Sequence, residues 1–112
     1  MRIISGVYKG QSLPKISVKG TRPTQARVRK SMLQILEPFT GKKVLDLFAG
    51  SGVLGIEAIS RGAISLVSVE NDRKMFKILN RNLAKICTDK PYEVFSMDAL
   101  SFIENCSQKF DI

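Results

Sequence analysis

The chain has 112 residues, enough for one small domain, and no apolar run of about 18 residues that would span a membrane. It contains no histidine and only two cysteines, Cys87 and Cys106, which argues against a zinc site. The cysteines are expected as small buried residues of a protein in the reducing cytoplasm, and the N-terminus lacks the apolar core of a signal peptide.

The net charge of +8 is concentrated at the start of the chain. Residues 1–43 contain ten lysines and arginines against one glutamate, whereas residues 44–112 contain eight basic and nine acidic residues. A localised basic segment indicates a polyanionic partner such as nucleic acid. The alternative is a solvated surface that is kept basic for solubility.

The first part of the chain predicts a hairpin and a helix. Residues 2–5 and 11–18 are predicted as two short strands, with Gly6 and Gly10 between them. A loop at 19–23 leads into a helix that Thr24 begins and Pro38 ends. Apolar residues at helical spacing predict its buried face: Val28, Met32, Ile35 and Leu36.

From residue 43 onward, strands alternate with helices. Strands are predicted at 43–48, 65–70 and 92–96, and helices begin at Ser51 or Gly52, after Asp72 and after Asp98. The fold class is therefore α/β: the N-terminal half of a Rossmann-like, doubly wound parallel sheet preceded by a small β-hairpin arm. We divide the chain into a basic hairpin arm, residues 1–23, and the N-terminal part of a larger domain, residues 24–112.

The strands predicted at 43–48 and 65–70 are mostly apolar on both faces, as parallel strands are when helices cover both sides of the sheet. Residues 109–112 resemble the opening of a fourth strand, which would be an unprotected edge. We therefore expect the sequence to be a piece of a longer domain. By itself it is expected to be marginally stable, dimeric or prone to aggregate, which makes self-association one of its expected interactions.

Acidic residues stand where the predicted strands end. Asp46 precedes the turn Ala49-Gly50-Ser51-Gly52, and Glu70 and Asp98 close the next two strands. The carboxyl ends of parallel strands converge on one crevice, and a glycine turn there lets a nucleotide-like ligand lie against bare backbone. The sequence therefore predicts a ligand site at this edge.

Two kinds of ligand fit the pattern. Gly50–Gly55 matches G-x-G-x-x-G and Glu70 follows twenty residues after Gly50, which favours a dinucleotide-binding module. However, the Asp46 carboxylate would repel a pyrophosphate and suits a cationic head group. S-adenosylmethionine carries an ammonium and a sulfonium, so we expect Asp46 to anchor the ammonium, Glu70 to accept the ribose hydroxyls and Asp98 to meet the adenine amine.

Three residues near these strand ends can serve the fold itself. Asp98 can cap the helix that follows it, a role compatible with ligand binding. Phe48 is predicted to pack in the core rather than to stack on a ligand. Gly55 is predicted to allow a close approach of helix and strand.

Residues 46–52 together with Glu70 resemble the first two motifs of the class I S-adenosylmethionine-dependent methyltransferases. The opening Met1-Arg2-Ile3-Ile4-Ser5-Gly6 and the later Arg22-Pro23-Thr24 resemble one family, the bacterial 16S ribosomal RNA guanine-N2 methyltransferases of the RsmD type. The resemblance covers essentially all 112 residues. It implies methyl transfer to a guanine amine in 16S ribosomal RNA, with these residues at the cofactor: Asp46, Ala49, Gly50, Gly52, Glu70 and Asp98.

The resemblance also bears on partners and catalysis. It implies that basic residues of the arm and of the helix after it contact the phosphates of 16S ribosomal RNA or of the small ribosomal subunit, with no metal and no membrane involved: Arg2, Lys9, Arg22, Arg27 and Arg29. The family's Asp/Asn-Pro-Pro-aromatic motif, which orients the guanine amine, would begin after Ile112. We therefore expect no catalytic residue in this chain and no methyl transfer by it alone. A non-catalytic RNA-binding remnant is the third hypothesis.

Overall fold

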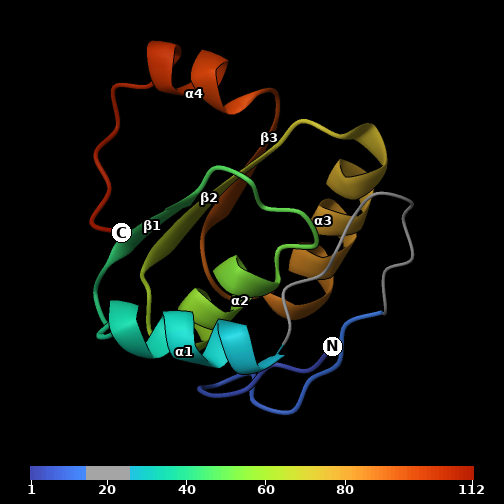
Figure 1. Ribbon diagram of the computed structural model, residues 1–112, viewed down its shortest axis with the longest axis vertical. Helices are drawn as coiled ribbons and strands as arrows, with labels where there is room; N and C mark the ends of the chain where they lie inside the picture. Colours follow the sequence, from blue (N-terminus) through green and yellow to red (C-terminus); the bar gives the residue numbers. More distant parts are fainter. Residues whose placement is uncertain (15–25) are drawn as a thin grey trace.

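A computed structural model describes residues 1–14 and 26–112 (Figure 1). The described elements are α1 (Ala26–Leu36), β1 (Lys43–Asp46), α2 (Val53–Ser60), β2 (Ser65–Glu70), α3 (Arg73–Ile86), β3 (Tyr92–Ser96) and α4 (Ala99–Asn105). The strands form one parallel sheet in the order β1-β2-β3, with Val44 beside Leu66 and Ser68 beside Val94. The predicted α/β fold is confirmed as the first part of a Rossmann-like sheet.

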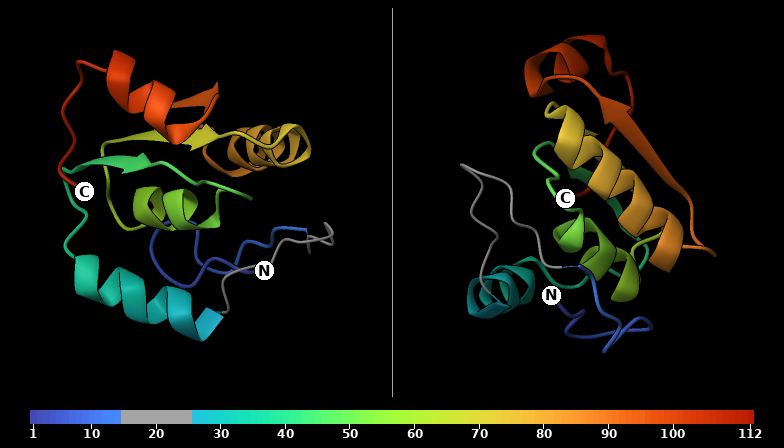
Figure 2. Two further views of the ribbon diagram at one scale, coloured as in Figure 1. Left: turned by 45° about the horizontal axis from the view of Figure 1, so that its top comes forward. Right: turned by 90° about the vertical axis from the view of Figure 1, so that its right-hand side faces the viewer.

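Helices cover both faces of the sheet, as doubly wound topology requires. Figure 2 shows α4 on one side of the sheet and α1 and α2 on the other. Successive residues of β2 point to opposite faces, so Leu66 packs with Ile56 and Leu79 of α2 and α3, whereas Val67 packs with Phe102 of α4. No helix in residues 1–14 or 26–112 is long and apolar enough to cross a membrane.

The C-terminal residues run along the edge of β1 that β2 leaves free (Figure 1). The Leu45 amide donates to the Ile112 carbonyl at 2.9 Å, and the Asp111 amide donates to the Lys43 carbonyl at 2.8 Å. These residues hydrogen-bond where the fourth strand was expected, although they do not form a regular strand.

The N-terminal residues pair with each other over a shorter length than predicted. Arg2 and Ser12 form a single antiparallel bridge, and the Ile3 amide donates to the Gln11 carbonyl at 2.9 Å. Residues 1–14 form no regular strands, and the remainder of the second predicted strand lies outside the described residues. Ile3, Tyr8 and Leu13 are buried in the same core as α2, so the segment packs on the domain.

The predicted buried face of α1 is wrong. Its expected core residues, Val28, Met32, Ile35 and Leu36, are 40 to 81% exposed, whereas Arg29 and Leu33 are each 2% exposed. Arg29 and Leu33 are four residues apart and therefore share a face of the helix. The Arg29 guanidinium can be buried there because its Nη2 donates to the Arg2 carbonyl at 3.0 Å.

Two smaller predictions also fail. The first strand ends at Asp46, two residues earlier than predicted, because the chain turns away from β2 once Asp46 has paired with Ser68. Cys87 is buried as expected, but Cys106 is half-buried, since it follows the last residue of α4 at the margin of the smaller core cluster.

Candidate cofactor-binding site

The turn after β1 is hydrogen-bonded to the carboxyl end of the neighbouring strand, β2. The Ala49 amide donates to the Val69 carbonyl at 3.0 Å, and the Gly52 amide donates to the Ala49 carbonyl at 2.8 Å. Gly50 and Gly52 have φ angles of +55° and +85°, which favour glycine. A Cβ on Gly52 would also lie 2.6 Å from Leu79 Cδ1. Gly52 therefore leaves room for the Leu79 side chain of α3, and both glycines allow the left-handed backbone of the turn.

Glu70, at the end of β2, fastens this turn. Its Oε1 accepts a hydrogen bond from the Gly50 amide at 2.8 Å, and its Oε2 accepts one from the Asp72 amide at 2.9 Å. Asp72 in turn caps α3 by accepting from the Met75 amide at 2.9 Å. The structure thus joins the end of β2 to the glycine turn after β1, which agrees with the expected convergence of the strand ends. Each carboxylate oxygen keeps a further lone pair for a hydroxyl donor.

Asp46 has an acceptor oxygen without a partner among residues 1–14 and 26–112. Within these residues its buried Oδ2 forms no hydrogen bond, and its Oδ1 accepts a long bond of 3.4 Å from the Phe48 amide. Burial raises the pKa of this carboxyl, the Phe48 amide partly offsets that effect, and the nearby Glu70 charge raises the pKa further. An unpaired buried carboxylate oxygen is costly, so the site suits a ligand that brings a cation or a donor.

Asp98 caps α4. Its Oδ1 accepts from the Ser101 amide at 2.9 Å and its Oδ2 from the Ser101 hydroxyl at 2.8 Å, and these bonds lower the pKa of its carboxyl. The capping interpretation is therefore confirmed. Asp98 lies at the carboxyl edge of the sheet after β3, but none of its described hydrogen bonds connects it to Asp46 or Glu70.

The prediction that Phe48 packs in the core is wrong. The side chain is 82% exposed, because the strand ends at Asp46 and Phe48 belongs to the turn. An exposed aromatic ring between Asp46 and Ala49 offers a flat apolar surface beside the candidate site. The sequence feature that could have predicted the exposure of Phe48 is the glycine turn after it, because the strand ends before that turn.

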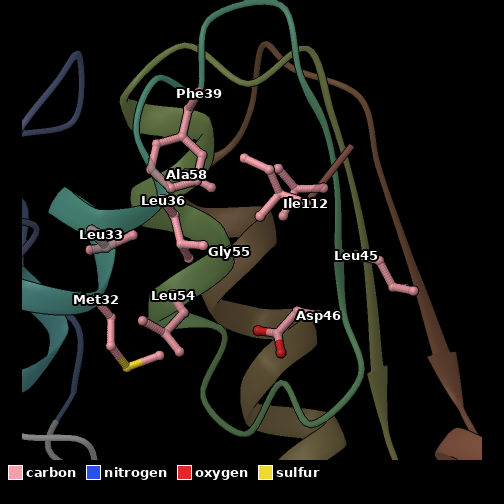
Figure 3. Close-up of a pocket in the computed structure, with 11 residues that line it drawn as sticks. Met32, Leu33, Leu36, Phe39, Leu45, Asp46, Leu54, Gly55, Ala58 and Ile112 are labelled. Atoms are coloured by element: carbon pink, nitrogen blue, oxygen red, sulfur yellow. The ribbon is translucent and has the colours of Figure 1, made fainter. Parts of the chain in front are cut away.

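A hollow of about 200 Å³ lies between α1, α2, β1 and the C-terminal residues (Figure 3). Figure 3 shows Asp46 near Leu54 at one end and Phe39 at the other. The residues that line it are apolar except for Asp46: Met32, Leu33, Leu36, Phe39, Val44, Leu45, Leu54, Gly55, Ala58 and Ile112. No pattern in the sequence indicated this hollow, since its walls come from four separate segments.

The predicted RNA-contacting residues are placed differently from one another. Arg2, Lys9 and Arg27 are exposed, and Arg22 lies outside the described residues. Arg29 does not reach the surface, because its guanidinium is buried and donates to the Arg2 carbonyl. Arg29 therefore stabilises the fold, and the prediction that it contacts phosphates is corrected. In residues 1–14 and 26–112, no group of three or more metal-ligating side chains is clustered.

A family model described as "Conserved hypothetical protein 95" matches residues 1–112. The chain belongs to this family. Among its relatives is the "Putative rRNA methyltransferase YlbH" of Bacillus subtilis, 43% identical over 100 residues, which covers 88% of this chain and 54% of the relative. The "Ribosomal RNA small subunit methyltransferase D" of Haemophilus influenzae is 37% identical over 106 residues, which covers 93% of this chain and 55% of the relative.

A solved structure agrees with these relatives. The "Putative methyltransferase yhhF from Escherichia coli" superposes with a TM-score of 0.79 at 39% identity, over 92% of this chain and 56% of that chain. These matches confirm that the chain resembles methyltransferases of the RsmD type. The chain spans about half the length of the curated relatives that it matches.

Proposed function

We propose that this chain binds S-adenosylmethionine and supplies the cofactor-binding half of an enzyme that methylates the exocyclic amine of a guanine in 16S ribosomal RNA in the bacterial cytoplasm. One observation carries the proposal: the buried Oδ2 of Asp46, which has no hydrogen-bond partner in the described part of the chain, lies at the end of β1 beside the glycine turn that Glu70 holds. The names of the relatives support the methyltransferase activity and the small-subunit RNA substrate.

Each site residue has a proposed role. Asp46 accepts the ammonium of the cofactor, Glu70 accepts the ribose hydroxyls, and Asp98 accepts the adenine amine with a lone pair that its capping bonds leave free. Ala49, Gly50 and Gly52 present backbone on which the ligand lies. Bound there, S-adenosylmethionine would supply an electrophilic methyl group.

The basic surface has a proposed role in holding the RNA. Arg2, Lys9 and Arg27 are exposed, and together with Arg22 they are proposed to contact phosphates, which position a nucleic acid without reading its bases. Arg29 acts through the fold by holding the carbonyl of Arg2. We assign no residue of these 112 to the orientation of the guanine amine, and we attribute methyl transfer to the whole protein.

Calorimetric titration of S-adenosylmethionine tests the cofactor role. Asp46→Asn keeps the shape of the side chain but removes its charge, and Glu104→Gln removes an exposed acid of α4 as a matched control. We expect Asp46→Asn to weaken binding about tenfold or more, which is 1.4 kcal/mol or more, and the control to leave it unchanged. Equal affinities in all three proteins would refute the anchor.

The same titration separates the alternatives. Tighter binding of a nicotinamide dinucleotide than of S-adenosylmethionine would support the dinucleotide-binding module instead. If the protein binds RNA but no S-adenosylmethionine, the non-catalytic remnant becomes the better account. Phosphate contacts themselves predict that log K for RNA falls with log salt by about 0.7 to 0.9 per contact.

A further inference from the structure

We propose that Glu57 of α2 is a positioning residue that holds the basic N-terminal segment, residues 1–14, in a fixed register against the helix that begins at the glycine turn. The inference rests on the proposed function, since it concerns how the RNA-contacting side chains Arg2 and Lys9 are placed relative to the cofactor. Neither the charge pattern nor the methyltransferase motifs pointed to this residue.

Glu57 is fully buried inside the domain at 0% exposure. Its Oε1 accepts a hydrogen bond from the Ile4 amide at 2.5 Å, across 53 positions of the chain. Its Oε2 lies 3.5 Å from Nε of Arg61, the residue that follows α2, and the two side chains form an ion pair. A carboxyl group is costly to bury, and burial alone would favour an apolar side chain here. Its structural contribution is therefore the acceptor that it offers to Ile4.

Ser60, three residues further along α2, continues the same contact. Its hydroxyl donates to the Ser5 carbonyl at 2.6 Å and accepts from the Tyr8 amide at 2.9 Å, while its carbonyl accepts from the Val7 amide at 2.8 Å. A Cβ on Gly6 would lie 1.9 Å from the Ser60 carbonyl oxygen, so the two backbones touch. Residues 4 to 8 are thus bonded directly to Glu57 and Ser60, and these bonds fix their register relative to α2.

The Arg61 side chain extends this attachment to the end of α1. Its Nη1 donates to Oε1 of Glu37 at 2.6 Å, and Glu37 follows the last residue of α1. The Arg61 side chain is 7% exposed and lies between Glu57 and Glu37. Glu57 therefore belongs to a charged chain that joins the N-terminal segment, α2 and the end of α1.

The position of α2 explains why this matters for RNA. The helix starts directly after Gly52 and extends over eight residues, about 12 Å, to Ser60. A rigid helix of that length fixes the distance between the glycine turn and the N-terminal segment. Apolar contacts of Ile3, Tyr8 and Leu13 keep the segment attached, and Glu57 selects its register. Without Glu57, RNA must order Arg2 and Lys9 on binding, which costs affinity.

Two substitutions at Glu57 in the full-length protein separate its chemical roles. Glu57→Gln retains an acceptor for the Ile4 amide, whereas Glu57→Leu keeps a similar volume but offers none. Ser60→Ala is a second variant that removes the hydroxyl contacts to Ser5 and Tyr8 if Glu57→Leu does not fold. Phe102→Leu is the control, because it loosens packing on the opposite face of the sheet.

The first readout is amide hydrogen exchange without RNA. In Glu57→Leu we expect the amides of Ile4, Val7 and Tyr8 to exchange about tenfold faster, while those of β2 keep their protection. Glu57→Gln should restore the protection of Ile4. Unchanged exchange at Ile4 in Glu57→Leu, or an equal loss of protection in β2, would overturn the proposal.

The second readout is binding of a 16S ribosomal RNA fragment and of S-adenosylmethionine. We expect Glu57→Leu to bind the RNA about tenfold more weakly and the cofactor within about twofold of the wild type, with Glu57→Gln restoring RNA affinity. An RNA affinity no weaker than that of Phe102→Leu would refute the positioning role. A wild type that binds neither ligand would refute the proposed function and the RNA role, whereas the exchange data would still decide whether Glu57 holds the segment.

Discussion

The amide of Gly50 donates a hydrogen bond of 2.8 Å to the carboxylate of Glu70, which joins the turn after β1 to the end of β2. The second oxygen of Glu70 accepts from the Asp72 amide at the start of α3, so one side chain holds both the glycine turn and the beginning of α3. The backbone of the candidate site is therefore held in place by the protein itself, which would reduce the ordering cost of binding a ligand there.

Replacement of Glu70 is expected to affect both stability and binding. Glu70→Ala leaves two amides without their charged acceptor, which we expect to lower the free energy of unfolding by about 1–2 kcal/mol. It should also weaken S-adenosylmethionine binding by about tenfold or more. Urea unfolding and calorimetry measure the two effects, with Glu93→Ala at an exposed position of β3 as the control. Cofactor affinity equal to that of Glu93→Ala would contradict the assignment.

Gly52 and Gly10 provide a matched pair, because both have a φ of +85°. An alanine at either position incurs the cost of a left-handed backbone, about 1–2 kcal/mol. Only at Gly52 would the new Cβ meet Leu79 Cδ1 at 2.6 Å, whereas at Gly10 no atom of the described residues lies within 4 Å of it. We expect Gly52→Ala to destabilise the protein by about 1–3 kcal/mol more than Gly10→Ala.

Urea unfolding compares these two glycine variants directly. The Leu79 contact should also be testable by relief: Leu79→Ala, introduced into the Gly52→Ala protein, should cost less stability than it does in the wild type. Equal destabilisation by the two alanines would mean that backbone conformation alone, and not the approach of α3, requires the glycine.

The stability contribution of Asp46 is expected to depend on pH relative to a neutral side chain. Burial raises the pKa of its carboxyl in the folded state, so the folded state holds this proton more tightly than the unfolded chain does. Raising the pH from the ordinary aspartate range, near 4, through the raised folded pKa therefore removes stability. Asp46→Asn should gain stability relative to the wild type across that window.

Urea unfolding from acidic to neutral pH measures this difference. Each tenfold difference in proton affinity between the folded and unfolded states corresponds to about 1.4 kcal/mol at pH values above both pKa values. The affinity for S-adenosylmethionine should change in the opposite direction, weakening as the pH falls and the Asp46 carboxyl is protonated. A stability difference that stays constant over the whole pH range would exclude a raised pKa at Asp46.

The two cysteines are expected to react at very different rates. Burial, followed by the neighbouring Asp89 charge, raises the pKa of the Cys87 thiol to about 12, so little reactive thiolate forms at pH 8. Cys106 is half-buried at the end of α4. With an aromatic disulfide reagent, Cys106 should react in the folded protein and Cys87 only after unfolding. Cys106→Ser should abolish the fast reaction, and Cys87→Ser should leave it unchanged.

The sheet and the centre of the candidate site could be predicted because their signals are local. Apolar runs, the Asp72 cap and the glycine turn each lie within a few residues of the structure that they specify. Parallel topology then brings the ends of β1 and β2 together, as predicted, and the hydrogen bond between Gly50 and Glu70 is a contact that the structure adds.

The contacts that were missed depend on segments far apart in the chain. Val28 and Ile35 mark one face of α1, but the buried face is decided by Leu33 and by the Arg2 carbonyl that receives the Arg29 guanidinium. Helical periodicity cannot supply such a partner. The attachment of Ile4 to Glu57 is of the same kind, because a glutamate in a helix ordinarily predicts a solvent-facing position.

The burial of Ile3, Tyr8 and Leu13 in the core sets an order of events during synthesis. These residues leave the ribosome before their partners, since Ile4 bonds to a side chain 53 positions later and the Tyr8 hydroxyl bonds to Asp89, 81 positions later. Translation proceeds at about 5–20 residues per second, so residues 4 and 8 wait several seconds until Glu57 and Asp89 have been made. The N-terminal segment therefore reaches these native contacts only after most of the sheet has been synthesised.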